Sequence, residues 1–273
     1  MVNIIQKLTL KELQELQLNA FMEVDSFCRK NNIIYYLIGG TLLGAIRHGG
    51  FIPWDDDMDI AMMRDEYDKF VQIYKTKLEN GLFLQNYHTD IDFSPALSRV
   101  CIKGTYVKIN STEHLKFNKN TYIDIFPLDN VPDDDELALK HEKQLKRIDK
   151  LISLKLYAVY RNGLLNYKKH IKIIISFFLK VIPLRCLQNK REEIMTKYSN
   201  CETNRVCSTV SKYGYKKQII DRRVYGSPIL VKFEGEEFFA PKQYTDYLTQ
   251  IYGDYMDLPP EEKRVKPVDV YKL

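Results

Sequence analysis

The sequence has few cysteines and no long uninterrupted apolar run, and these shortages exclude several classes of protein. Its five cysteines are odd in number and none belongs to a C-x-x-C pair. This argues against a disulfide framework or a zinc site and favours reduced thiols in a cytoplasmic protein. The first residues lack a cationic region followed by an apolar one, so we expect no secretory signal peptide. There is no internal repeat and no low-complexity tract. We therefore expect an ordinary globular protein of the cytoplasm.

Positive charge is concentrated in the middle of the chain. The net charge is +5, but residues 136–200 alone hold 15 basic and 5 acidic side chains. Within them, residues 170–185 (HIKIIISFFLKVIPLR) are strongly apolar and bracketed by cations. This stretch is shorter than the roughly 20 apolar residues that span a bilayer. It is either a buried helix of a helical subdomain or a basic amphipathic helix on anionic lipid. No nucleic-acid partner is expected, because few aromatics accompany these cations and no known motif is present.

The run from Tyr36 to Met62, YLIGGTLLGAIRHGGFIPWDDDMDIAM, is the most informative part of the chain. It predicts a strand, a Gly-Gly-Thr turn, a short helix, a loop and a second strand that carries Asp57 and Asp59. Side chains two residues apart on a strand share a face, at about 7 Å spacing. Two such carboxylates repel unless a cation lies between them. Mg²⁺ (or Mn²⁺) binds through a few carboxylates together with substrate phosphates. We therefore predict a divalent metal at Asp57 and Asp59.

The turn formed by Gly39, Gly40 and Thr41 predicts a phosphate site. Glycines allow close backbone approach, and the first N–H groups of a helix attract anions. Arg47 near the end of the same helix could clamp a phosphate with its fork of donors. Alternatively, it is a solvated cation favoured by the helix dipole. His48 is expected to be structural or exposed.

A third carboxylate lies in the β-rich segment 121–129, TYIDIFPLD. Asp124 stands among apolar residues, where a charge is costly unless it is paired or ligated. If this strand pairs beside the strand of Asp57 and Asp59, three carboxylates converge on one metal site. The alternative is that Asp124 lies at a strand end and caps a turn before Pro127.

These segments resemble the LicD/fukutin family of phospho-alcohol transferases, within the polymerase-β-like nucleotidyltransferase superfamily. The resemblance rests on three segments: GGTLLGAIRHGGFIPWDDDMDIAM (39–62), YIDIFPLD (122–129) and FEGEEFFAPKQYTDYLTQIYGDYMDLPP (233–260). It implies an α+β fold, with a nucleotidyltransferase core sheet, flanking helices and a helical insertion. We expect the catalytic core at 1–135, the basic insertion at 136–200, and a C-terminal part at 201–273 that completes the domain.

The resemblance also implies an activity, the metal-dependent transfer of a phospho-alcohol from a CDP-activated donor to a sugar hydroxyl, with release of CMP. Bacterial members typically use CDP-choline and modify teichoic acid, lipopolysaccharide or capsule; eukaryotic relatives use CDP-ribitol. By position, Asp57 and Asp59 would hold metal and Asp124 would complete the site. Asp124 is also our candidate for taking the hydroxyl proton. Trp54 and nearby tyrosines could form an aromatic cage for choline. A lipid-linked or polymeric glycan acceptor would suit a protein peripheral to the inner face of the membrane.

Three other functions stay open. A nucleotidyltransferase that uses an NTP on a small hydroxyl compound would need the same glycine turn and acids. A sugar-nucleotide glycosyltransferase also uses D-x-D with a metal, but the nucleotide-binding βαβ unit that generally precedes it is not found. A non-catalytic binding protein at the membrane is the third, and the intact acids argue against it.

Periodicity and turn residues predict the remaining elements. A capping box at Thr9–Glu12 opens the first helix. A later hairpin turns at Gly235, and the following helix starts at Pro241 and stops at Gly253. The other expected elements are strands at 33–38, 82–87, 98–102 and 106–109, a helix at 64–74 and an exposed loop at 130–135.

Overall fold

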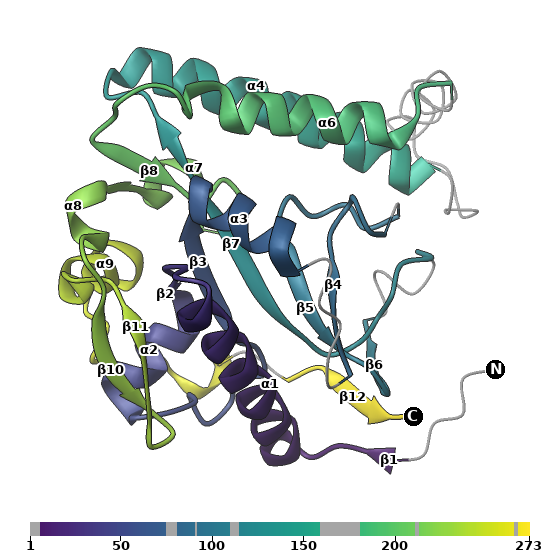
Figure 1. The fold of residues 1–273 in the computed structure, drawn as a ribbon, viewed down its shortest axis with the longest axis vertical. Coiled ribbons are helices and arrows are strands. Elements are labelled where there is room, and N and C mark those ends of the chain that lie inside the picture. The colour runs from purple at the N-terminus through teal and green to yellow at the C-terminus, as the bar shows by residue number, and fades with distance from the viewer. Residues whose placement is uncertain are drawn as a thin grey trace.

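The centre of the molecule is a mixed β-sheet. In the computed structural model, which describes residues 6–74, 81–90, 92–109, 115–158, 181–210, 213–264 and 267–273, the strand order is β2-β3-β7-β5-β4, with β8 pairing the end of β7 and β9 pairing β8. The strands are β2 (Tyr36–Leu37), β3 (Asp59–Met63), β4 (Leu82–Gln85), β5 (Ser98–Ile102), β7 (Tyr122–Val131), β8 (Arg205–Cys207) and β9 (Ile219–Asp221). The pair β3–β7 is parallel, and the other pairs are antiparallel. The predicted α+β class is confirmed (Figure 1).

Helices pack around this sheet. They are α1 (Leu10–Lys30), α2 (Gly39–His48), α3 (Arg64–Tyr74), α4 (Asp135–Ala158), α6 (Leu184–Met195), α7 (Tyr215–Gln218), α8 (Arg222–Tyr225) and α9 (Tyr244–Tyr252), with 3₁₀ turns at Thr196–Tyr198 and Glu261–Lys263. Helices α1 and α3 contact each other through the ring of Phe27, whose centroid lies 5.7 Å from Phe70 and 4.9 Å from Tyr74. Both helices also contact β7.

Strand β7 has two different faces because side chains alternate along it. Ile123 and Ile125 are fully buried and belong to the main hydrophobic core. Asp124 and Phe126, on the opposite face, line a pocket. The alternation of apolar and acidic residues that was visible in the sequence thus separates the core from the site.

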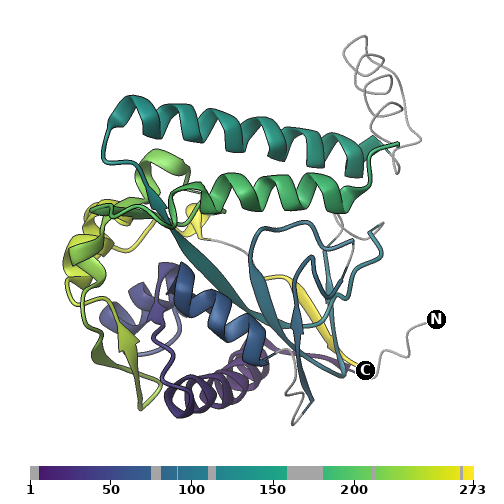
Figure 2. The ribbon, with the colours of Figure 1, turned by 45° about the horizontal axis from the view of Figure 1, so that its top comes forward.

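Helices α4 and α6 form an antiparallel hairpin along one side of the molecule (Figure 2). Leu145 of α4 clusters with Met195 at the end of α6, and Ile152 clusters with Leu187 near its start. The apolar segment predicted at 170–185 lies largely outside the described residues, so neither interpretation of it is tested. Within the described ranges, no helix is long and apolar enough to cross a membrane.

Two small sheets complete the fold. Strands β1 (Gln6–Lys7), β12 (Asp269–Lys272) and β6 (Thr105–Lys108) pair in that order, which brings the first and last described strands together. Strands β10 (Ile229–Phe233) and β11 (Glu236–Ala240) form the hairpin that was predicted to turn at Gly235.

Several local predictions are confirmed because they depend on short-range interactions. Thr9 Oγ accepts the Glu12 N–H at 3.3 Å, and the Glu12 carboxylate accepts the Thr9 N–H at 2.7 Å, which completes the capping box. The bounds of α3 and β5 agree with the expected ranges. Gly253 ends α9 with a positive φ of 72°.

Other boundaries were wrong. Asp57 precedes β3, which begins at Asp59. The expected loop at 130–135 is shorter, because β7 continues to Val131, and the strand predicted at 33–38 narrows to Tyr36–Leu37. Helix α9 does not start at Pro241. The N–H groups of the next two residues, Lys242 and Gln243, donate to the carbonyls of Tyr225 and Val224, so the chain is tied to α8 before the helix can begin.

Candidate active site

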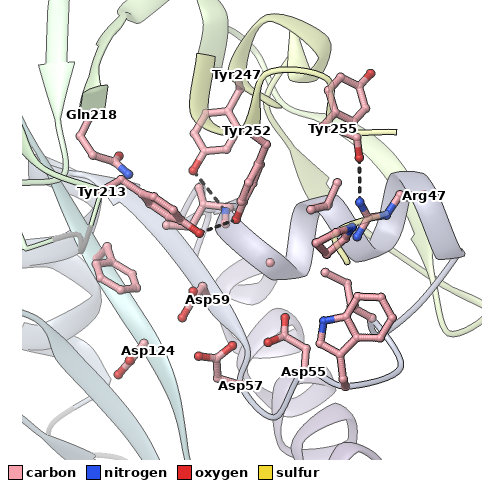
Figure 3. Close-up of a pocket in the computed structure, with 18 of the residues that line it drawn as sticks. Arg47, Asp55, Asp57, Asp59, Asp124, Tyr213, Gln218, Tyr247, Tyr252 and Tyr255 are labelled. Carbon is pink, nitrogen blue, oxygen red and sulfur yellow. Dashed lines mark hydrogen bonds between the residues drawn. The ribbon is translucent and has the colours of Figure 1, made fainter. Parts of the chain in front are cut away.

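A pocket of about 670 Å³ opens between α2, the strands β3, β5 and β7, and α9 with the loop that follows it (Figure 3). Most of the residues predicted from the sequence to form the site line it: Gly39, Gly40, Arg47, Trp54, Asp57, Asp59 and Asp124. Thr41 does not line it. Thr41 is buried, and its Oγ accepts the Asp59 N–H at 2.8 Å. Its observed contact therefore positions the acidic strand.

The parallel pairing of β3 and β7 brings the acidic residues together. Asp59 and Asp124 are register partners, so they lie next to each other on adjacent strands. The Asp124 N–H donates to the carbonyl of Met58 at 2.9 Å, which continues the pairing one residue before β3. Met58 is fully buried between Asp57 and Asp59, and both of these carboxylates line the pocket. The predicted pairing of the two acidic segments is confirmed.

The glycine turn fits closely against these carboxylates. Gly39 has φ +56°, and a Cβ there would lie 3.1 Å from Asp59 Oδ2. A Cβ on Gly40 would overlap with Asp55 Oδ2. The Gly39 N–H donates to the Tyr247 hydroxyl at 3.1 Å, and α2 has no side-chain cap. The two glycines therefore leave space that any side chain would fill.

The carboxylate oxygens of Asp55, Asp56 and Asp57 lie within 4.8 Å of one another. Asp55 and Asp57 line the pocket, whereas Asp56 Oδ2 accepts the Val268 N–H at 2.5 Å. Asp55, which the sequence analysis did not place in the site, therefore belongs with Asp57, Asp59 and Asp124. Oxygen donors of this kind fit a hard divalent cation. Gly39 and Gly40, which have no side chains, leave room beside Asp55 and Asp59.

Arg99 on β5 is a pocket residue that the sequence analysis did not identify. It is the register partner of Asp124, and its Nε donates to Asp124 Oδ1 at 2.7 Å. The guanidinium lies 3.5 Å from the ring centroid of Tyr122 and 5.1 Å from that of Phe93. Burial would lower the pKa of Arg99, but the Asp124 carboxylate outweighs this and the pKa is raised. One feature of the sequence could have identified Arg99: it is a cation within the strand predicted at 98–102.

Tyrosines form the wall of the pocket opposite the acids (Figure 3). The Tyr213 hydroxyl donates to the Tyr252 hydroxyl at 3.0 Å, and their rings meet edge to face. Tyr247 bonds the start of α2, as described above. Burial raises the pKa of both Tyr247 and Tyr252, so both stay neutral.

Arg47 connects α2 to the C-terminal loop. Its Nη1 donates to the carbonyls of Tyr255 at 2.8 Å and Asp257 at 3.0 Å. Arg47 is thus held by the loop and lines the pocket at the same time, which differs from a solvated helix-end cation. Trp54 at the pocket edge lies under the guanidinium of Arg264, at 4.4 Å from its ring centroid.

The fold and the pocket together define an α+β protein with an acidic, glycine-lined pocket. A family model described as "LicD/FKTN/FKRP, nucleotidyltransferase domain" matches residues 32–153, a range that contains the glycine turn and the pocket residues Asp55, Asp57, Asp59 and Asp124. The chain belongs to the LicD family.

Two relatives illustrate the extent of the similarity. The lipopolysaccharide cholinephosphotransferase LicD of Haemophilus influenzae is 32% identical over 259 residues, which cover 94% of this chain and 95% of that protein. The ribitol 5-phosphate transferase FKRP of Mus musculus is 26% identical over 93 residues, which cover 34% of this chain and 16% of FKRP. The first similarity extends over nearly the whole chain, and the second is local.

Proposed function

We propose that this protein transfers phosphocholine from CDP-choline to a sugar hydroxyl of a cell-surface glycan, such as lipopolysaccharide, teichoic acid or capsule, and releases CMP. The observation that carries the proposal is the register of β3 and β7, which places Asp59 beside Asp124 on the pocket. Similarity over nearly the full length to a cholinephosphotransferase supports the choice of cargo. The local similarity to a ribitol 5-phosphate transferase supports phospho-alcohol transfer as the general reaction. The proposal includes a nucleotidyltransferase-type core sheet.

The chain's own residues have distinct roles in this proposal. Gly39 and Gly40 present the start of α2 to the diphosphate, because the first N–H groups of a helix attract anions. Asp57, Asp59 and Asp124, with Asp55 beside them, would hold Mg²⁺ or Mn²⁺, which would neutralise phosphate oxygens and align the reacting groups. Arg47 would contribute a further donor to a phosphate at the pocket side of α2.

The transfer itself needs one bond to form and one to break. The acceptor oxygen attacks the phosphorus that carries choline, and the bond from that phosphorus to the bridging oxygen of the diphosphate breaks. CMP departs with the bonding electrons. The hydroxyl proton passes to the Asp124 carboxylate, whose Oδ1 is held by Arg99 at 2.7 Å. Such a positioned base contributes about 10²–10⁴-fold to a rate.

Trp54 and the pocket tyrosines would surround the choline group, since aromatic faces attract quaternary ammonium ions. Tyr213 and Tyr252 lie on the wall opposite the acids. Asp254 and Asp257, which also line the pocket, add negative charge on the side of the C-terminal loop. These charges would attract the quaternary ammonium of choline, whereas a polyol such as ribitol carries no positive charge for them to attract.

The test is to incubate the purified protein with CDP-choline, CDP-ribitol or CDP-glycerol and a glycan acceptor, with and without Mg²⁺, and to measure CMP by chromatography. We expect metal-dependent CMP release from CDP-choline, lost in Asp57→Ala. CMP release from CDP-ribitol alone would overturn the choice of cargo. No CMP from any donor, with pyrophosphate released from an NTP, would favour a nucleotidyltransferase. No turnover and no stabilisation by nucleotide with metal would favour a binding protein.

A further inference from the structure

Helix α4 has two faces of opposite character. The buried face packs toward α6 and the core through Ala138, His141, Leu145, Ile148 and Ile152. These positions recur every three to four residues, as one face of a helix requires. The opposite, exposed face carries four cations at the same spacing, which we call the basic stripe: Lys140, Lys143, Arg147 and Lys150.

The charges on α4 are segregated. The two acids between Lys140 and Lys150 lie beside the buried face and are paired: Glu142 with Lys146 at 2.6 Å, and Asp149 with Arg191 of α6 at 3.5 Å. Among the described residues, no ion pair includes a member of the basic stripe. Like charges three or four residues apart on a helix repel each other. An external anionic surface would relieve this repulsion.

The stripe also points away from the rest of the protein. In Figure 2, α4 lies at the outer edge of the molecule, with α6 along its inner side. Near its start, α4 also contacts α7 through His141 and Tyr215. Gln188 and Arg191 attach α6 to the carbonyls of Phe93 and Ser94. The stripe therefore lies on the outer side of the hairpin. At the hairpin end where α6 begins, Val181 is 84% exposed and Ile182 is 41% exposed.

We propose that the basic stripe of α4 docks the protein on a membrane surface that carries anionic lipid headgroups. Cations in single file along the outer side of one helix can touch a flat surface together, whereas a polymer chain is better held in a groove. Exposed apolar side chains near one end suit the boundary between headgroups and acyl chains.

The charge distribution of the whole chain would also orient the protein. Residues 136–158 and 181–200, which contain α4 and α6, carry a net charge of 10 − 5 = +5, whereas residues 1–135 and 201–273 carry 26 − 31 = −5. An anionic surface attracts the α4–α6 side and repels the other. Each Lys or Arg near such a surface strengthens binding by about five-fold, and salt weakens the effect.

The experiment is co-sedimentation of the full chain with phosphatidylcholine vesicles, with and without phosphatidylglycerol, over a range of salt. The test variant replaces all four stripe cations by Gln, a residue that helices tolerate well. The matched control replaces four exposed cations elsewhere by Gln: Lys11, Lys30, Lys103 and Lys232. Both variants lose the same net charge.

We expect wild type and control to bind vesicles that contain phosphatidylglycerol, and the stripe variant to bind at least about 100-fold more weakly. Equal loss in the two variants would overturn the proposal, because net charge alone would then explain binding. Binding to soluble dextran sulfate but not to vesicles would also overturn it and indicate a polymeric partner. CMP release with a soluble acceptor should be unchanged in the stripe variant. Vesicle binding and CMP release therefore test the docking proposal and the proposed function separately.

Discussion

Asp59 and Asp124 are direct neighbours across the parallel pair β3–β7, although 64 residues separate them along the chain. The same register places Arg99 against Asp124 from the other side. Asp124 on β7 thus lies between an acidic neighbour, Asp59 on β3, and a basic neighbour, Arg99 on β5.

Replacing the carboxylate of Asp59 or of Asp124 should strongly reduce transfer without unfolding the protein. Asparagine keeps the size of aspartate but cannot act as a carboxylate ligand or base, so Asp59→Asn and Asp124→Asn should lower CMP release by about 10²–10⁴-fold. Asp65→Asn, an exposed acid of α3, is the matched control and should keep wild-type activity. Wild-type turnover in a folded Asp124→Asn protein would contradict the mechanism.

Arg99 and Asp124 should be energetically coupled. Replacing Arg99 by Met leaves the Asp124 carboxylate without its partner at 2.7 Å. We expect a loss of about 2–3 kcal/mol in the free energy of unfolding, less than the roughly 3–5 kcal/mol typical of fully buried pairs, because the pocket is open to water. The double variant Arg99→Met/Asp124→Asn should recover part of the loss in urea denaturation. Strictly additive effects would argue against coupling.

The glycine turn provides a prediction with a close control. Gly39→Ala and Gly104→Ala both place a side chain at positive φ, +56° and +76°, and both should cost about 1–2 kcal/mol of stability. Only the Gly39 variant brings a Cβ near Asp59 Oδ2, whereas Gly104 has open space. CMP release should therefore fall at least about ten-fold in Gly39→Ala and stay near wild type in Gly104→Ala. Equal activities in the two variants would show that the space beside Gly39 is not needed for transfer.

His141 should make stability depend on pH. Its Nε2 donates to the carbonyl of Ile194 at 2.6 Å, so its Nδ1 accepts the Tyr215 hydroxyl at 2.7 Å, and the ring is neutral. Burial lowers the pKa of His141 in the folded protein. The unfolded chain therefore binds the proton more readily, and stability is complete above about pH 6.5 and declines as the pH falls below it, by up to about 1.4 kcal/mol per pH unit.

The measurement is urea denaturation between pH 5.5 and 7.5, compared with His141→Gln. That variant should be less stable at pH 7.5 but lose less on acidification. A parallel decline of the two proteins would assign the pH dependence to other groups.

The sequence determined the features that depend on residues close together in the chain. Four predictions that depend on short-range interactions are confirmed: the Thr9–Glu12 capping box, the bounds of α3, the turn at Gly235 and the end of α9 at Gly253. Asp57, Asp59 and Asp124, which line the pocket, were also identified from the sequence, because a carboxylate among apolar residues is costly unless it is paired or ligated. The pairing of the two acidic segments was one of two hypotheses for Asp124, and the structure confirms it.

Only the tertiary structure decided what surrounds those acids. The strand register selects Arg99 as the partner of Asp124, and the packing of α9 brings the Tyr247 hydroxyl to the Gly39 N–H. The C-terminal loop turns Arg47 toward two carbonyls more than 200 residues away. These contacts join segments distant in sequence, and a one-residue change of register would present different side chains. The local pattern assigns each residue to one face of its strand but does not say which residue of another strand lies opposite it, so only the folded chain specifies these partners.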